Sequence, residues 1–451
     1  MSITESICLL ICLSLLALSL VLDRSSSSPA TMFYGLWSII LGLDSLHLFK
    51  LLYTRDEVYS LITFGLCAFA VGYYFNKIIA TKGKIKKSVG YSLRRKLVYV
   101  FAIFAIIYYI DFVVKTIPYY LSGNALALIR AMAQDSSSEI SGNASGVMNA
   151  IKILFVTPFT LTLQIIIAVD WFFGNRDKKL IVLDIILMIE KIMSDGGRAP
   201  LIYLFIAFIL SYLLSKQRAK NHRLEKSSFA AHLEDIRIAA KKNKRTIVLF
   251  TVVALCGIVF LTQSRNGENF LKFSYYYFSM QPKMFDLWSS IVDRTGLVTY
   301  GAAALNGFLF FVFYLIRNIL GLAGYPEFWS NAYGLIEGTG TQWQTISGYG
   351  SSANSFVSAF WVLYLDGRVI GIIIGMLVYG WIMSHTYNDA LLAKSSKSIS
   401  LYVLLYIGLF YTFVRLQFAN LFYCEEILLI LFVLYRRDSL HRKEDWKNEK
   451  E

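Results

Sequence analysis

Apolar stretches of about 20 residues recur along nearly the whole chain, and this repetition restricts the fold more than any other feature. A helix of that length crosses the hydrocarbon core of a lipid bilayer. The sequence is 56% hydrophobic and only 16% charged, whereas a soluble domain is about a quarter charged. A water-soluble fold has too little interior to bury so much apolar surface. The sequence therefore predicts an all-α, polytopic integral membrane protein.

The predicted membrane spans are expected to be helical, because lipid offers the backbone no hydrogen-bond partners. They cover residues 6–22, 31–49, 58–76, 97–117, 148–170, 180–195, 199–215, 246–262, 368–386, 400–418 and 421–436. The first resembles a signal peptide but lacks a preceding positive charge, so we expect it to be retained. Segment 300–320 is apolar but interrupted by polar residues, and is compatible with a span, a re-entrant helix or an interfacial helix. We thus expect a single membrane domain over residues 1–451 with about 11–12 transmembrane helices.

Lysine and arginine predict which loops face the cytoplasm. They concentrate in loops 77–96 and 216–245, in residues 176–179 and in the tail 437–451. The positive-inside rule places such segments in the cytoplasm and accounts for the net charge of +14 without nucleic acid as a partner. Loops 118–147 and 263–367 are then on the outer side, with the N-terminus outside and the C-terminus inside.

The outer loop 263–367 is too long for a simple connection, and unusually long loops are often functional. We expect it to contain a re-entrant or amphipathic helix. Its stretches "FSYYYFSM", "YPEFWSNAY" and "TQWQTISGYGSSANSF" alternate aromatic with small polar residues, as suits stacking on sugar rings and hydrogen bonding to sugar hydroxyls. The alternative is an interfacial aromatic belt. The predicted glycan contacts are Tyr275, Tyr276, Tyr277, Trp329 and Trp343.

Several arginines remain on the predicted outer side, where the positive-inside rule disfavours them. Because the guanidinium fork bonds phosphate oxygens in pairs, a cluster at this level suits a lipid-linked phosphate or pyrophosphate. The alternative is pairing within the protein, for example Arg198 with Asp195 or Arg368 with Asp366. The outer arginines considered as ligands are Arg198, Arg265, Arg294, Arg317, Arg368 and Arg415.

The stretch "KIMSDGGRAPLIYLF", residues 191–205, predicts an outward hairpin between two spans. Gly196 and Gly197 allow the turn, and Pro200 suits the first turn of the descending helix. Arg198 would then lie near a helix N-terminus, which itself favours anions.

The sequence lacks the residue patterns of metal sites, disulfide frameworks and nucleotide-binding sites. The five cysteines form no Cys-x-x-Cys motif or Cys/His cluster, which argues against a zinc site or a disulfide framework. None of the five histidines falls within residues 263–367, and no Asp-x-Asp or nucleotide-binding glycine motif occurs. The sequence therefore predicts no metal and no nucleotide cofactor.

Three segments carry a resemblance to a known family. They are "SDGGRAPLIYLFIAFIL" (194–210), "SRNGENFLKFSYYYFSMQPKMFD" (264–286) and "SANSFVSAFWVLYLDGRVIGIIIGMLVYG" (352–380). Together with the span number and the long late loop, they resemble the Wzy-type O-antigen polymerases, which are bacterial oligosaccharide repeat-unit polymerases. The resemblance implies a membrane glycosyltransferase of the GT-C type in the bacterial inner membrane, with its active site facing the periplasm.

In such an enzyme undecaprenyl-pyrophosphate-linked glycan is both donor and acceptor, and no cofactor or metal is needed. The implied partners are a flippase and a chain-length regulator of the same pathway. Arg198 and Arg265 match the arginines of the first two motifs, Asn354 belongs to the Asn-x-Phe part of the third, and Asp366 and Arg368 match the third loosely.

The expected mechanism is glycosyl transfer with lipid pyrophosphate as the leaving group. Arg198 and Arg265 would stabilise its charge, and a carboxylate would assist the attacking sugar hydroxyl. The candidate bases are Asp195, Asp286 and Asp293, with Glu327 and Glu337 as further candidates.

Two other functions stay open. An O-antigen ligase-type transferase is expected to carry a histidine in the long outer loop, and residues 263–367 contain none. A lipid-linked oligosaccharide flippase should show repeated halves or charges near the bilayer midplane. Asp111, Asp184 and Glu190 are the intramembrane acids that keep this alternative open.

Overall fold

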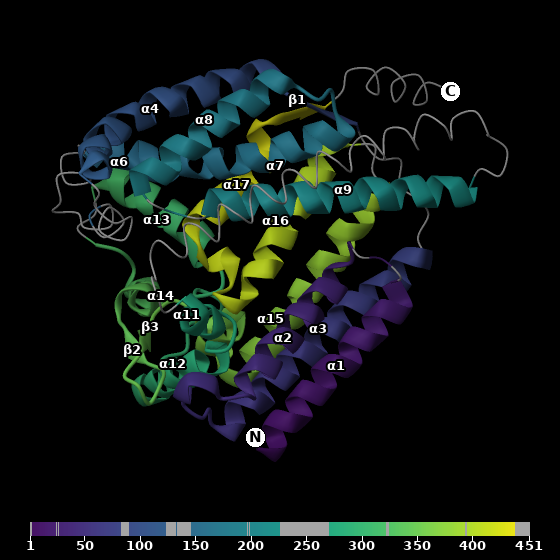
Figure 1. The fold of residues 1–451 in the computed structure, drawn as a ribbon, viewed down its shortest axis with the longest axis vertical. Helices are drawn as coiled ribbons and strands as arrows, with labels where there is room; N and C mark the ends of the chain where they lie inside the picture. Colours follow the sequence, from purple (N-terminus) through teal and green to yellow (C-terminus); the bar gives the residue numbers. More distant parts are fainter. Residues whose placement is uncertain are drawn as a thin grey trace. The chain divides into compact units, whose positions relative to one another are not determined.

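The described part of the chain folds almost entirely as helices (Figure 1). The chain divides into two compact units. The computed structural model describes residues 2–23, 25, 27–82, 90–122, 132, 146–195, 197, 199–225, 270–321, 324–392 and 395–437. Unit 1 comprises Met1–Lys84, Leu271–Tyr387 and Gly408–Cys424, and unit 2 comprises Ile85–Phe270, Asn388–Ile407 and Glu425–Glu451. Each unit is built from segments that are distant in the sequence, so the hydropathy pattern contains no signal for this division. The single membrane domain expected from the sequence stays a prediction.

Unit 1 contains the first three helices and most of the predicted long loop. Its elements are α1 (Ile3–Asp23), α2 (Pro29–Asp44), η1 (Leu48–Lys50), α3 (Asp56–Lys82), α11 (Phe270–Tyr277), α12 (Gln281–Thr295), α13 (Asn306–Leu320), α14 (Glu327–Thr341), β2 (Gln344–Thr345), β3 (Ser352–Ala353), most of α15 (Ser358–Leu392), η4 (Tyr411–Phe413) and η5 (Gln417–Ala419). Strands β2 and β3 pair antiparallel, with Gln344 opposite Ala353.

Unit 2 contains the central helices and the end of the described chain. Its elements are β1 (Tyr91–Leu93), α4 (Arg95–Leu121), α6 (Gly146–Ile151), the π-helix η2 (Lys152–Val156), α7 (Thr157–Phe173), α8 (Lys178–Asp195), α9 (Ala199–Glu225), most of α16 (Ser396–Phe410), the second half of α17 (Leu421–Leu428), the π-helix η6 (Leu429–Val433) and β4 (Tyr435–Arg437). Strands β1 and β4 pair antiparallel, with Tyr91 opposite Arg437.

Seven helices in the described part of the chain are long and apolar enough to cross a membrane. They are Ile3–Asp23, Asp56–Ile78, Arg95–Leu121, Val147–Phe173, Ala199–Ala219, Ser358–Leu392 and Ser396–Phe413. The other predicted spans coincide with the shorter or less apolar helices α2, α8 and α17, except 246–262, which lies outside the described residues. The prediction of an all-α, multi-pass membrane protein is confirmed.

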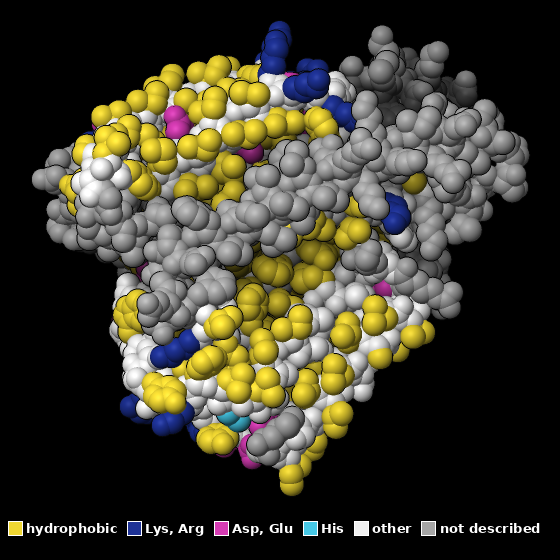
Figure 2. Space-filling view, in the orientation of Figure 1, with side chains coloured by type: hydrophobic (Ala, Val, Ile, Leu, Met, Phe, Trp, Pro, Cys, Tyr) yellow, Lys and Arg dark blue, Asp and Glu magenta, His cyan; other side chains and the backbone are white. Residues whose placement is uncertain are grey.

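The surfaces of these helices are those of lipid-facing segments. Exposed apolar side chains run along α1, including Leu10 and Val21, and along α4, including Val100 and Ile107. Figure 2 shows hydrophobic side chains spread over the surfaces of both helices. Exposing such apolar surfaces to water costs free energy, and a lipid bilayer removes this cost by covering them.

The ambiguous segment 300–320 forms one short helix in its second part. Helix α13 has 15 residues, about 22 Å of rise, which is less than the bilayer core of about 30 Å. It ends where Gly321 adopts a left-handed conformation, the usual way to terminate a helix. The neighbouring α12 has Pro282 in its first turn and ends at Gly296 in the same conformation.

Helices α3 and α15 approach closely because glycines stand at their contact. A Cβ on Gly72 would overlap the carbonyl of Leu377, and a Cβ on Gly380 would overlap that of Phe69. Small residues allow such approach in membranes, where helices associate through van der Waals packing rather than the hydrophobic effect. Tyr73 packs at the same contact.

Helix α15 reverses near its start instead of running straight. The backbone leaves helical geometry at Gly367 and at Arg368, whose φ is 54°. Residues 358–366 then fold back against the rest of the helix, so that a Cβ on Gly371 would overlap the carbonyl of Leu363. The prediction began this span at residue 368, because Asp366 and Arg368 interrupt its hydropathy, and thereby missed the preceding helical segment.

In unit 2, charged side chains join the start of α4 to the connection between α7 and α8. Arg95 forms ion pairs with Asp170 and, at 3.1 Å, with Asp177. Tyr99 donates to Asp177 at 2.7 Å. Helix α8 ends at Asp195 and α9 begins at Ala199, with Pro200 in its first turn. Residues 196 and 198 of the predicted hairpin lie outside the described residues, so the hairpin stays a prediction.

Candidate functional site

Several predicted site residues meet around α12 in unit 1. Asp286 is buried and pairs with Arg55, and Lys283 donates to its second oxygen at 2.8 Å. The hydrogen bond to Asp286 is the main reason that the pKa of the Arg55 guanidinium lies above its ordinary value. Both oxygens of Asp286 are already engaged by cations, so the geometry favours a structural role for Asp286 over that of a base.

Asp293 lies on the same helix and is more accessible. It accepts a hydrogen bond from Tyr364 at 2.7 Å, and its side chain remains 42% exposed. The guanidinium of Arg368 stands above the Tyr364 ring at 5.1 Å, and its Nε lies 3.8 Å from Asp293. Of the three carboxylates proposed as bases, Asp293 is the one that the described structure leaves open to a substrate.

Asp366 organises the loop before α13. Its Oδ1 accepts hydrogen bonds from the hydroxyl of Thr299 (2.6 Å) and the amides of Gly301 (2.8 Å) and Ala303 (2.9 Å). Its Oδ2 accepts from the amide of Ala304 at 2.8 Å. Asp366 therefore holds the loop 299–304 and is not the partner of Arg368 that sequence analysis considered.

Arg415 differs from these residues because no ion pair or side-chain hydrogen bond engages its guanidinium among the described residues. It is half-buried, and burial lowers its pKa despite the nearby charge of Glu337. Its Nη2 and the hydroxyl of Ser355 both come within 4 Å of the space beside Gly340. A partly desolvated arginine without a fixed partner is suited to bind an anion.

The loop segments around Arg415 are held by hydrogen bonds. Asn354 donates through Nδ2 to the carbonyl of Gly340 at 2.6 Å, and the amide of Ser355 donates to Thr339 at 2.7 Å. The amide of Ser358 donates to the carbonyl of Val414. Asn354, predicted as a substrate contact, thus positions one wall of the Arg415 environment through its amide.

The aromatic residues predicted to contact glycan fall into two groups. Tyr275 and Tyr276 are buried, and their hydroxyls donate to backbone carbonyls of Leu43 and Phe49. Trp329 is fully buried and stacks on Tyr333, with centroids 5.0 Å apart. The positions of Tyr275, Tyr276 and Trp329 favour a role in packing the protein interior over contact with glycan.

Two aromatic residues remain closer to the surface. Tyr277 is half-buried and meets Phe356 edge to face, with ring centroids 5.1 Å apart. Trp343 is 66% exposed and is therefore the accessible aromatic of the predicted set.

The remaining predicted residues are dispersed or lie outside the described part. Arg294 donates to the carbonyl of Ser290 on its own helix, and Arg317 stands 4.8 Å from the centre of the Tyr325 ring. Arg198 and Arg265 lie outside the described residues, as does the side chain of Asp195. Their predicted catalytic roles stay predictions.

Sequence reasoning missed two sets of partners. Lys283 stands three positions before Asp286, a spacing that places both on one face of a helix and that could have been noticed. The donors to Asp366 come from a loop more than sixty residues earlier, and no local spacing reveals them.

In the described part of the chain, no group of three His, Cys, Asp or Glu side chains is arranged to hold a metal ion. Comparison with protein-family models, curated proteins and solved structures gave no match to the chain.

Proposed function

We propose that this protein is an integral-membrane glycosyltransferase that polymerises undecaprenyl-pyrophosphate-linked oligosaccharide repeat units. The product would be O-antigen or a similar surface polysaccharide, made at the periplasmic face of the bacterial inner membrane. The three motif segments support this proposal from the sequence. The observation in the structure that supports it is the guanidinium of Arg415, which has no ion-pair partner among the described residues of a multi-pass membrane protein.

A pyrophosphate leaving group gives Arg415 its function in the proposal. A hydroxyl oxygen of the acceptor sugar attacks the anomeric carbon of the donor, and the bond from that carbon to the pyrophosphate oxygen breaks with its electron pair. The departing undecaprenyl pyrophosphate gains negative charge, which a preorganised guanidinium stabilises. Arg198 and Arg265 are proposed to act with Arg415.

The proton of the attacking hydroxyl needs an acceptor. Asp293 is proposed as this base because its carboxylate is accessible and engaged mainly by the Tyr364 hydroxyl. Asp286 is already paired with Arg55 and Lys283. The released pyrophosphate can take the proton finally, so the charge and atom balance closes without a cofactor.

A transporter of lipid-linked sugars is the second candidate, and buried carboxylates favour it. In unit 2, Asp184 and Glu425 are buried, and Asp184 Oδ1 and both Glu425 oxygens have no hydrogen-bond partner in the described structure. Intramembrane acids of this kind often mark proton or substrate paths.

Deleting the gene and examining surface glycan on a gel separates these functions. Loss of a polymerase leaves lipid A-core capped by a single repeat unit, whereas loss of a ligase leaves polymer on the undecaprenyl carrier. Loss of a transporter leaves no surface glycan. Persistence of long-chain ladders in the deletion strain would refute the polymerase assignment.

Complementation with Arg415 variants tests the residue itself. Arg415→Gln removes the charge and is expected to slow transfer by about a hundredfold, as loss of one oxyanion donor does in other enzymes. Arg415→Lys keeps the charge without the fork and should be intermediate. Arg294→Gln is the matched control, since Arg294 bonds only to its own helix among the described contacts. Equal ladders from Arg415→Gln and Arg294→Gln would exclude Arg415 from the site.

A further inference from the structure

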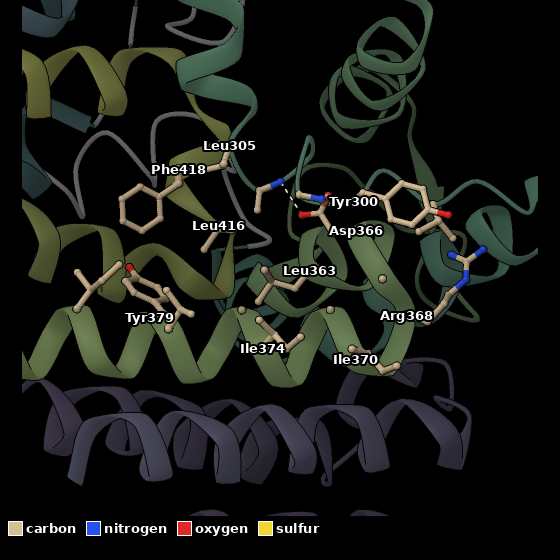
Figure 3. Close-up of a pocket in the computed structure, with 18 of the residues that line it drawn as sticks. Tyr300, Leu305, Leu363, Asp366, Arg368, Ile370, Ile374, Tyr379, Leu416 and Phe418 are labelled. Carbon is tan, nitrogen blue, oxygen red and sulfur yellow. Dashed lines mark hydrogen bonds between the residues drawn. The ribbon is translucent and has the colours of Figure 1, made fainter. Parts of the chain in front are cut away.

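An apolar pocket of about 850 Å³ lies in unit 1 along the second part of α15 (Figure 3). Ile370, Ile374, Val378 and Ile382 line it and recur every four residues, so they share one face of the helix. Leu305, Leu416 and Phe418 lie across from this face (Figure 3). Val298 and Phe308 also line the pocket.

The dimensions of the pocket suit a hydrocarbon chain. From residue 370 to residue 382 the helix rises about 18 Å, close to one leaflet of a bilayer core of about 30 Å. Apart from Tyr300, Asp366, Arg368 and Tyr379, the lining side chains are apolar or glycine. A sugar would find few hydrogen-bond partners there, whereas a hydrocarbon chain has no hydrogen bonds to replace on entering the pocket.

The helical face of the pocket is accessible from the surface of unit 1. Ile370 is 68% exposed, Ile374 58% and Val378 44%, although all three belong to a helix of membrane-spanning length. In a bilayer these side chains meet lipid. A lipid chain can therefore enter sideways from the membrane without passing through water.

One end of the pocket carries a cation. Arg368 lines this end; its Nη2 donates to the carbonyl of Val292 at 3.1 Å, and its Nη1 is buried without a hydrogen-bond partner in the described structure. Two acids stand nearby: Asp366 is bonded by four donors of the loop 299–304, and Asp293 lies 3.8 Å from Arg368 Nε. The Arg368 side chain as a whole is 27% exposed, so its charge is accessible to an anionic head group at the end of an apolar pocket.

We infer that this pocket holds the polyprenyl chain of the lipid-linked substrate, with the phosphate nearest the chain beside Arg368. The identity of the lipid rests on the proposed function, whereas the location of the chain rests on the pocket alone. Bulk phospholipid has the same general chemistry, so the experiments below compare the two.

Photo-crosslinking in the intact protein tests the location. Ile374 is replaced by benzoylphenylalanine in the native strain, the membranes are irradiated, and the lipid adduct is identified by mass spectrometry. Ile373 is the matched control, because it is an exposed isoleucine on the same helix that does not line the pocket. A polyprenyl phosphate or pyrophosphate adduct at 374, absent at 373, is expected. Phospholipid adducts at both positions, or no adduct at 374, would overturn the inference.

Binding of undecaprenyl pyrophosphate to the purified protein tests the fit. Ile374→Trp displaces about two methylene groups of the chain and should weaken binding about tenfold, while Ile373→Trp changes it by less than about twofold. Arg368→Gln should weaken binding of undecaprenyl pyrophosphate but leave binding of undecaprenol unchanged. Unchanged binding in Ile374→Trp, or competition by phosphatidylglycerol at equal concentration, refutes the assignment.

These outcomes are separable from the test of polymerisation. If the lipid binds at Ile374 but the deletion strain retains its ladders, the pocket stands and the proposed function falls. If the deletion abolishes the ladders but Ile374→Trp binds and polymerises as the wild type does, the function stands and the pocket assignment falls.

Discussion

Replacing Asp366 by alanine is expected to release the loop 299–304 from the turn in α15. The carboxylate receives four hydrogen bonds, three of them from backbone amides that have no alternative acceptor among the described contacts. Each hydrogen bond to a charged group contributes about 1.5–3 kcal/mol, but such contributions do not add fully and water can enter the vacated space. Two backbone hydrogen bonds, from Thr299 and Tyr300 to residues 365 and 366, remain. We therefore expect a local loss of about 3 kcal/mol.

Asp366→Asn should have a smaller effect. Its Oδ1 can still accept the three hydrogen bonds from Thr299, Gly301 and Ala303, but an NH₂ group would face the amide of Ala304. Loss of one bond and of the charge corresponds to about 1–2 kcal/mol. Asp366→Ala is expected to be more destabilising than Asp366→Asn because Oδ1, which Asn retains, accepts three of the four hydrogen bonds.

Hydrogen exchange of the amides of Gly301, Ala303 and Ala304 in the detergent-purified protein measures this loss directly. A local change of about 3 kcal/mol accelerates exchange about 150-fold for Asp366→Ala, and one of about 1–2 kcal/mol accelerates it about 5- to 30-fold for Asp366→Asn. Asp293→Ala is the control, because its exposed carboxylate contributes about 1 kcal/mol or less and its partners among the described residues, Tyr364 and Arg368, lie outside this loop. If exchange in Asp366→Ala stays within about threefold of the wild type, or if Asn is the more disruptive substitution, the reasoning is wrong.

Two further variants probe the helical hairpin of α15 and the charged cluster of unit 2. Gly371→Ala places a Cβ against the carbonyl of Leu363 and should lower the free energy of unfolding by about 1–3 kcal/mol, whereas Gly367→Ala, with open space around its Cβ, should stay within about 0.5 kcal/mol. Thermal unfolding in detergent measures both, and equal midpoints would argue against the close approach. Desolvation acts to raise the pKa of Asp177, but hydrogen bonds from Tyr99 and backbone amides outweigh it and hold the pKa below the ordinary 3.8. The stability from this carboxylate is therefore present above pH 3.8 and lost as the pH falls further. The difference in unfolding midpoint between wild type and Asp177→Asn should be constant from about pH 5 to 8 and shrink below about pH 4; an undiminished difference at about pH 3 would contradict this account.

The helices were predictable because hydropathy and length are local properties of the sequence. Lipid demands that a spanning backbone satisfy its own hydrogen bonds, so an apolar run of sufficient length has one regular structure available. The prediction failed at the start of α15, where Asp366 and Arg368 lower the hydropathy although residues 358–366 are helical. There the acid is bonded by a distant loop and the buried Trp361 packs in the core, and neither fact is encoded within a short window.

The candidate site, too, was only partly predictable from the sequence. The sequence identified the kinds of residue that grip anions and sugars, and Arg415 and Asp293 remain available for those roles in the described structure. It could not distinguish them from Asp286, whose charge is taken up by Arg55, or from Trp329, which is fully buried. Composition alone does not separate a free guanidinium from a paired one, because the partner can come from anywhere in the chain.

By itself the sequence determined that this protein is an all-α membrane protein, since about 20 apolar residues in a row can be satisfied only by a spanning helix. The tertiary structure decided which charges are neutralised and where an apolar pocket stays open. Asp366 binds a loop, Arg368 lines the end of the pocket along α15, and Arg415 forms no ion pair with any described residue. These outcomes depend on contacts between segments tens to hundreds of residues apart, and such contacts form only when the helices pack.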